Sequence, residues 1–274
     1  MKKILLISII ALFGLTGCTI PFLQKEESAQ NNGVTFAVIG DNEGVNHYYD
    51  AFMTQIAEDS DVQFILHVGD IVSNGGQTEI EEILTHQNTF GLHVPMYVIP
   101  GNHDIYDDPE RAAFENGFGE IPRSIDIGDV HLVLLDNADR KVGFSDEDLN
   151  WLDQDLNEHA DKDIILAYHR PFNYPLANTL GDDETTASDK SNEEFQYVIA
   201  KYNILAIFNG HIHTYLEFPF IVRDSNGTST SIPDYISGGG GQSPQDIFGS
   251  LFSSDYHWLK VTIQNGALTV EKQS

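Results

Sequence analysis

Five short apolar runs, each followed at once by polar residues, constrain this sequence more than any other feature. They occupy residues 34–39, 63–68, 94–100, 163–168 and 204–208. Such runs, bounded by turn-forming residues, predict buried strands. Segments with helical spacing of apolar residues lie between several of them, and this alternation predicts βαβ units with a largely parallel sheet. In α/β folds, ligands bind at the carboxyl ends of the strands.

Carboxylates, amides and imidazoles follow the five runs. In chain order they are Asp41 and Glu43; Asp70; Asn102, His103 and Asp104; His169 and Arg170; Asn209, His211 and His213. Taken alone, a loop that reads Asn-His-Asp is more often plain turn chemistry than a site. Its recurrence in related form after five strands favours one shared site. Oxygen and imidazole ligands without a thiol suit hard or borderline divalent metals.

Helical spacing predicts the segments that connect the strands. Helices are expected over residues 45–59, 78–90, from 108 toward 114, from 145 to 156, and over 192–202. Thr78 and Glu81 have the spacing of a capping box. Gly128-Asp129 predicts the turn of a hairpin between residues 123–127 and 130–135.

The chain after His213 is strand-rich, with strands expected over residues 215–223, 231–237, 256–263 and 267–271. Glycines at 238–241 interrupt them and would serve either close approach to a ligand or a flexible loop. The long polar segment 173–191 is interpreted as a solvated surface loop or as a lid over the site.

The N-terminus has the features of a targeting segment. Lys2 and Lys3 precede an apolar stretch, residues 4–12, that is too short to span a bilayer comfortably. Leu15-Thr16-Gly17-Cys18 resembles a bacterial lipobox, with an ordinary secretory signal as the alternative. We therefore expect a signal peptide over residues 1–17, lipidation of Cys18, a flexible tether over 18–33 and one domain over 34–274. The protein would be exported and lipid-anchored to the bacterial cell membrane or envelope.

Charge and cysteine content limit the remaining possibilities. The chain has 42 acidic and 14 basic residues, a formal net charge of −28, and one cysteine, so it can form no intramolecular disulfide. No basic patch is visible in the sequence, and binding to a nucleic-acid backbone is not expected. Attraction for phosphate would have to come from local metal charge. The sequence leaves the oligomeric state open.

The series Asp41, Gly69-Asp70, Gly101-Asn102-His103-Asp104, His169 and Gly210-His211-Ile212-His213 resembles the motifs of the calcineurin-like metallophosphoesterases. The chain is similar to a bacterial lipoprotein member of that superfamily from about residue 34 onward. The resemblance implies an α/β fold, a double β-sandwich of two mixed sheets flanked by helices in four layers (α/β/β/α). It also implies two divalent metal ions (Mn, Fe or Zn) and hydrolysis of phosphomonoesters or phosphodiesters by a metal-activated hydroxide.

The resemblance implies a role for each motif residue. Asp70 would bridge the two metals; Asp41 and His213 would complete one site, and Asn102, His169 and His211 the other. His103 would act as general acid or electrostatic stabiliser, oriented by Asp104. Arg170 is a candidate for binding phosphate, with a structural ion pair as the alternative.

The first motif departs from the family pattern. The family has Asp-x-His, whereas this chain has Asp41-Asn42-Glu43. Glu43 would replace the histidine as a ligand, or water would complete the site; His47 is a weaker substitute. Ser73-Asn74 stand where purple acid phosphatases carry a tyrosine ligand.

A non-catalytic lipoprotein that keeps the fold as a binding module is the alternative function, and retention of His103 favours the enzyme.

The remaining histidines are interpreted as structural. His67 and His131 lie within strand patterns and are expected to be packed or hydrogen-bonded, and His86, His93 and His159 are expected on the surface or in loops. His257 follows the glycine loop and is a minor candidate for approaching the site.

Overall fold

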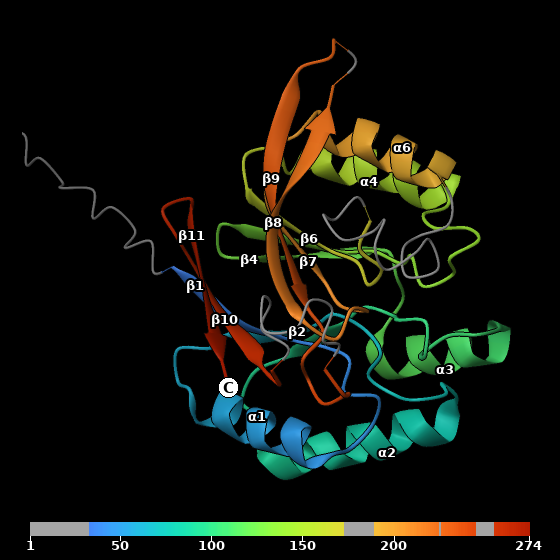
Figure 1. The fold of residues 1–274 in the computed structure, drawn as a ribbon, viewed down its shortest axis with the longest axis vertical. Helices are drawn as coiled ribbons and strands as arrows, with labels where there is room; N and C mark the ends of the chain where they lie inside the picture. The colour runs from blue at the N-terminus through green and yellow to red at the C-terminus, as the bar shows by residue number, and fades with distance from the viewer. Residues whose placement is uncertain (1–32, 173–188, 225, 245–254) are drawn as a thin grey trace, which may run out of the picture. The chain divides into compact units, whose positions relative to one another are not determined.

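Two mixed β-sheets form the centre of the fold (Figure 1). The structure is a computed structural model that describes residues 33–172, 189–224, 226–244 and 255–274. The expected signal peptide, Cys18 and almost all of the expected tether lie outside the described residues, as does most of the candidate lid. Within the described residues, no helix is long and apolar enough to cross a membrane.

The first sheet has the order β11-β10-β1-β2-β3. Its strands are β1 (Val34–Ile39), β2 (Phe64–His67), β3 (Met96–Val98), β10 (Trp258–Gln264) and β11 (Ala267–Gln273). β1, β2 and β3 are parallel, whereas β10 runs antiparallel to both β1 and β11. The third strand is shorter than the predicted 94–100, with only Met96–Val98 in the ladder.

The second sheet has the order β4-β5-β6-β7-β9-β8. Its strands are β4 (Arg123–Ile127), β5 (Val130–Leu134), β6 (Asp163–Ala167), β7 (Ile204–Asn209), β8 (Tyr215–Arg223) and β9 (Ser229–Ser237). β5, β6, β7 and β9 are parallel. The predicted hairpin is confirmed, because β4 and β5 pair antiparallel around Gly128, which has φ 60°.

Helices cover the outer face of each sheet. They are α1 (His47–Glu58), α2 (Gln77–Gln87), α3 (Asp108–Phe118), α4 (Asp146–Glu158) and α6 (Asp189–Ile199), with a short 3₁₀ turn at Asn88–Phe90. Figure 1 shows α1, α2 and α3 on one side and α4 and α6 on the other. α6 begins three residues earlier than predicted, and residues 200–202 form a turn after it.

Three apolar clusters confirm the four-layer order. Phe36 and Val38 of β1 pack between the sheets with Phe208 of β7. The alternate residues Ala37 and Ile39 pack on the helices of the first outer layer. Burial on both faces explains why β1 is a continuous apolar run rather than an alternating one. A third cluster joins the second sheet to α4 and α6.

The capping box predicted at Thr78 is wrong. α2 begins at Gln77 after Gly76, which has no side chain to cap the helix. Glu79 instead accepts hydrogen bonds from the backbone amides of Ser73 and Asn74, both at 3.0 Å, and so holds the loop before the helix. A capping box does occur at α3, between Asp107 and Glu110.

Candidate metal centre

Hydrogen bonds join the loops that follow strands within each sheet and across the two sheets. The Asp41 amide donates to the Gly69 carbonyl at 3.0 Å, and the Gly210 amide donates to the His169 carbonyl at 3.1 Å. Oδ1 of Asp41 accepts from the amide of His211 at 2.7 Å, across 170 residues of chain. The edge predicted from the sequence therefore exists, and residues after β1, β2, β6 and β7 meet there.

Unusual backbone angles concentrate at this edge. Of the described residues other than glycine, five have positive φ, and four of them are Asp41, Glu43, Asp70 and His211, at 60°, 46°, 52° and 69°. Such conformations are unfavourable for residues with a Cβ and are retained where the surrounding structure enforces them, often at functional sites. A Cβ added at Gly101 would collide with the Asp70 carboxylate. Glycine at this motif position therefore lets the two loops approach.

Asp70 lies at the centre of the donor groups. Its Oδ1 accepts from the His103 amide at 2.8 Å, and its Oδ2 lies 3.1 Å from Nε2 of His169. Asp70 belongs to two sets whose ligand atoms all lie within 4.8 Å of one another: one with His169 and His211, the other with Glu43 and His103. A carboxylate shared by two donor sets has the position that a bridging ligand requires, and the bridging role stays a prediction.

Unpartnered lone pairs at the site show that the residues fit a cation. Oδ2 of Asp41, Oδ1 of Asn102 and Nε2 of His169 are buried and have no hydrogen-bond partner among the described residues. His169 Nδ1 bonds the Val68 carbonyl at 2.7 Å, and a carbonyl can only accept. In the neutral ring, Nε2 therefore presents a lone pair to Asp70. Buried acceptors that face one another need a positive charge between them.

Burial also disfavours the charged forms of several groups at the centre. Burial and the neighbouring Asp70 raise the pKa of Asp41 well above its usual range. Burial lowers the pKa of His211 well below its usual range and also lowers that of His213. Neutral imidazoles are the form that binds metal, and buried carboxylates ionise when a cation is near. The shifts therefore agree with a metal site.

His103 has a different partner from the one expected. Its Nδ1 bonds the carbonyl of Ser73 at 3.0 Å and lies 3.2 Å from the hydroxyl of Tyr106. Asp104 does not orient it, because the Asp104 carboxylate accepts the backbone amides of Val72 at 3.0 Å and Gly101 at 2.8 Å. Burial, with Asp70, raises the pKa of Asp104 to about 7. Asp104 thus braces the loop, and Ser73 fixes the imidazole.

Glu43 points into the site. Its Oε1 lies 3.7 Å from Nε2 of His103 and 3.9 Å from Nε2 of His213. Its Oε2 accepts from the Gln242 amide at 2.8 Å, and the side chain is 15% exposed. Asp41 Oδ1 lies 3.7 Å from the same His213 nitrogen. The carboxylate therefore occupies the neighbourhood in which the family histidine was expected.

Arg170 lies beside the centre and contacts a predicted ligand. Its Nη1 donates to Nε2 of His211 at 2.9 Å, and its Nε donates to the carbonyl of Ala138 at 3.0 Å. Asn137 bonds the Arg170 backbone on both sides, at 2.8 and 3.0 Å. One lone pair cannot serve both a guanidinium and a metal, so binding of a metal through Nε2 of His211 requires Arg170 to shift.

Sequence reasoning missed the residues that support the site from a distance. Gln242, Ser73 and Asn137 contact site residues but have no motif that marks them.

His67 was expected to be packed or hydrogen-bonded, which is confirmed by its 2.7 Å contact with Oδ1 of Asn42. His257 is buried against Gly239, where its Nε2 lies 3.2 Å from Ser237 Oγ.

The other structural interpretations of the histidines hold where contacts are described. His131 is held between Asp126 at 2.7 Å and Asp155 at 2.8 Å and stacks on His159. Asp126, His131 and His159 form a third group with metal-binding spacing. Both ring nitrogens of His131 are already used by carboxylates, so we interpret the group as an ion-pair network that joins the β4–β5 hairpin to α4.

A two-sheet α/β sandwich with oxygen and imidazole donors at its strand ends defines a metal-binding protein of the phosphoesterase type. A family model described as calcineurin-like phosphoesterase matches residues 34–215, more than half of the 274-residue chain. The chain therefore belongs to that family. The match ends at Tyr215, the first residue of β8, so it leaves out the rest of β8 and all of β9, β10 and β11, which complete the two sheets.

Named relatives agree with the family. A probable glycerophosphodiester phosphodiesterase of Arcobacter nitrofigilis is 29% identical over 157 residues, covering 54% of this chain and 56% of that protein. A probable cyclic nucleotide phosphodiesterase of Ruthia magnifica is 28% identical over 161 residues, covering 58% of this chain and 65% of that protein. The chain thus spans less than two thirds of the length of either relative.

Solved structures show the same fold. GAP50 of Plasmodium, described as the anchor in the inner membrane complex, has a TM-score of 0.64 at 14% identity and covers 88% of this chain and 84% of that chain. PhoD has a TM-score of 0.64 at 12% identity, and the match covers 88% of this chain and 68% of that chain. At these identities the likeness concerns the fold alone.

Proposed function

We propose that the protein is a metal-dependent phosphoesterase that hydrolyses phosphodiesters or phosphomonoesters with two divalent ions. The observation that carries this proposal is the position of Asp70, shared by two donor sets beside the unpartnered lone pairs of Asp41, Asn102 and His169. The curated relatives are named as phosphodiesterases, which favours diesters. When bound, a pair of divalent ions polarises a phosphate and lowers the pKa of water.

The chain itself supplies a proton donor and a shaped site. His103 Nδ1 donates to the Ser73 carbonyl, which leaves Nε2 as the nitrogen that faces the site near Glu43. A proton at Nε2 would pass to the leaving oxygen, and the Glu43 carboxylate at 3.7 Å stabilises the imidazolium that holds it. Asp104 keeps Gly101 and Val72 in place, so the loop that carries Asn102 and His103 is fixed before substrate binds.

Metal removal and restoration test the proposal. Chelator-treated protein should lose hydrolysis of bis(para-nitrophenyl) phosphate and para-nitrophenyl phosphate and regain it with manganese, iron or zinc. Metal content measured in parallel should fall in Asp70→Asn. Asp161→Asn makes the same chemical change in an exposed turn and should keep the metal. Full hydrolysis by thoroughly metal-free protein would refute the proposal. Metal binding without hydrolysis of either ester would favour the non-catalytic binding module.

We also propose that the protein is exported and anchored to the cell membrane or envelope by a lipid on Cys18. The support is the lipobox-like Leu15-Thr16-Gly17-Cys18 after an apolar stretch, together with the absence of any other cysteine. A segment of about fifteen residues between Cys18 and β1, polar from Gln24 onward, would then separate the domain from the membrane.

A further inference from the structure

A cavity of about 430 Å³ adjoins the metal centre. Asn102, a predicted ligand, lines it, and so do Arg170, which contacts His211, and Tyr106, whose hydroxyl reaches His103. The cavity is therefore lined by one predicted ligand and by residues that contact His211 and the predicted proton donor His103. A substrate whose phosphate lies at the centre would extend another group into this space.

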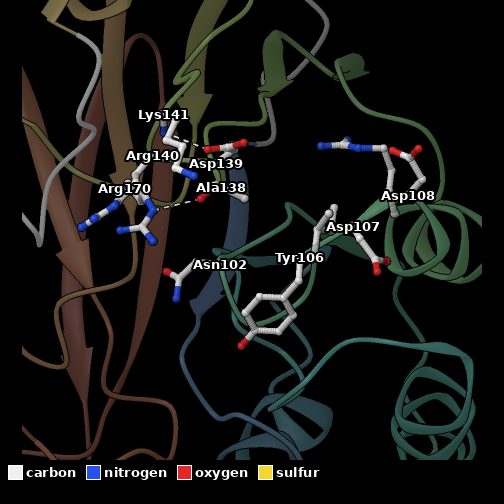
Figure 2. Close-up of a pocket in the computed structure, with 11 residues that line it drawn as sticks. Asn102, Tyr106, Asp107, Asp108, Ala138, Asp139, Arg140, Lys141 and Arg170 are labelled. Carbon is white, nitrogen blue, oxygen red and sulfur yellow. Dashed lines mark hydrogen bonds between the residues drawn. The ribbon is translucent and has the colours of Figure 1, made fainter.

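The charge of this cavity differs from that of the chain. The sequence has only 14 basic residues against 42 acidic ones, yet Arg111, Arg140, Lys141 and Arg170 all line this one cavity. Arg111 is engaged by Asp136 at 2.7 Å. Figure 2 shows Arg140, Lys141 and Arg170 together on the wall beside Asn102. Positive charge is thus concentrated next to the metal centre.

The acidic residues that line the cavity do not neutralise the charge of Arg140, Lys141 and Arg170, which together are called the basic wall below. Figure 2 shows Asp107 and Asp108 across Tyr106, on the opposite side from the basic residues. Asp107 accepts the Glu110 amide at 3.2 Å and caps α3. Asp139 lies nearer, and its Oδ1 accepts the backbone amide of Lys141 at 2.7 Å. The carboxylates of Asp107 and Asp139 thus accept local backbone amides, and a concave surface focuses the field of the basic residues.

The basic wall is attached to the site. Arg170 Nε donates to the carbonyl of Ala138, and Asn137 is bonded to the backbone of Arg170 at 2.8 and 3.0 Å. The segment that carries Arg140 and Lys141 is thus held against the residue that follows the predicted ligand His169. The backbone that carries these cations therefore has a defined position relative to the centre, which is what discrimination between substrates requires.

We propose that Arg140 and Lys141 form a subsite for a second anionic group of the substrate, a phosphate, phosphonate or carboxylate a few bonds from the scissile phosphate. This inference rests on the proposed function and adds a substrate class to it. An exposed cation gives a modest, salt-sensitive gain for each contact, and it recognises charge rather than one chemical group. The subsite therefore selects doubly anionic phosphoesters over esters with a neutral arm.

The test compares aryl phosphodiesters that differ only in the second arm. One series carries alkyl arms of increasing length that end in a phosphonate, which is not hydrolysed at this centre; the control carries a butyl arm. Release of para-nitrophenolate gives kcat/KM for each, and their ratio measures selection for the anion. Arg140→Gln with Lys141→Gln should reduce that ratio about tenfold. Lys190→Gln with Lys201→Gln removes two cations outside the cavity and should leave it unchanged.

The split between KM and kcat, the Arg140→Lys variant and the salt dependence each test whether Arg140 and Lys141 bind the second anion. The change should lie in KM rather than in kcat, because the contact exists before and during reaction. Arg140→Lys should retain the ratio, and added salt should lower it in the wild type. Equal kcat/KM for both arms in the wild type at every arm length, or an unchanged ratio in the double variant, would overturn the subsite.

Binding separates failure of the subsite from failure of the proposed function. If neither ester is hydrolysed, the proposed function fails. Calorimetry with propylenebisphosphonate and propylphosphonate then tests the subsite by itself. Tighter binding of the bisphosphonate that is lost in the Arg140 and Lys141 double variant supports the subsite, and equal binding of the two compounds excludes it.

Discussion

Glu43→Gln should weaken metal binding and leave the fold intact. The substitution removes a negative charge while keeping the size of the side chain and a polar group for Gln242 at 2.8 Å. The carboxylate lies 3.7 Å from His103 Nε2 and 3.9 Å from His213 Nε2, so it faces the donors directly. A side chain that pointed to solvent would not be 15% exposed with one oxygen bonded to Gln242.

The size of the effect follows from the electrostatics. Two unit charges about 4 Å apart interact by about 4 kcal/mol at an effective dielectric constant of about 20, and contact with water reduces this value. Carboxylates that support metal ligands typically change affinity by about ten- to hundredfold. We therefore expect a loss of about ten- to hundredfold in metal affinity, or about 1.4–2.7 kcal/mol.

The assay is competition for manganese and zinc against a fluorescent chelator. Glu81→Gln is the matched control, because Glu81 is exposed on α2 and bonds only Gln77 among the described residues. Gln242→Ala should show a smaller loss, since the charge remains while its position is released. Glu43→His should shift preference toward zinc, because an imidazole replaces a hard oxygen ligand. Unchanged affinity and preference in all three variants would refute the argument.

Three further predictions concern other parts of the chain. His103→Ala should lower turnover by about two to four orders of magnitude with metal content near normal; loss of the metals would make His103 a ligand, as its place beside Glu43 and Asp70 also allows. Cys18→Ser should release the protein from membranes without altering hydrolysis, and continued membrane fractionation with a processed N-terminus would reject the lipobox. Burial lowers the pKa of His131, but the hydrogen bonds to Asp155 and Asp126 outweigh burial and raise the pKa overall. The protonated ring therefore stabilises the fold fully below about pH 6.5, and this contribution is lost as the pH rises through the raised pKa. Urea unfolding across this range should show that loss in the wild type and a flatter profile in His131→Gln.

The sequence predicted the fold and the edge that carries the site because both depend on chain-level patterns. Runs such as residues 34–39 are apolar at every position, which occurs when both faces of a strand are covered. Parallel strands bring their carboxyl ends to one edge, so Asp41 and Asp70 had to lie close together if the runs were strands. His169 follows β6 of the other sheet, and its bond to the Val68 carbonyl brings it to the same place. The family resemblance then supplied the double sandwich, which periodicity alone does not distinguish from other layered folds.

The partners of individual side chains could not be predicted in the same way. The family resemblance implied that Asp104 orients the His103 ring; the turn instead directs the Asp104 oxygens to the amides of Val72 and Gly101. Gln242 meets Glu43 across 199 residues, and no local pattern encodes such a contact. Glu81 was expected to cap a helix and instead bonds Gln77, whereas Glu79 holds the preceding loop, because that loop has backbone donors to satisfy.

The backbone contacts of the site determine which experiments on it can be interpreted. The strained angles at Asp41, Asp70 and His211 are held by bonds that involve main-chain groups, such as Asp41 to the Gly69 carbonyl at 3.0 Å and Glu43 to the Asp70 carbonyl at 2.9 Å. These two bonds do not depend on the identity of the side chain, whereas the bond from the His211 amide to Asp41 Oδ1 does. Asp70→Asn keeps an oxygen that can still accept the His103 amide, so the loop should retain its conformation while the charge is lost. Loss of metal in that variant would therefore report on coordination and not on unfolding, provided that its thermal unfolding remains cooperative.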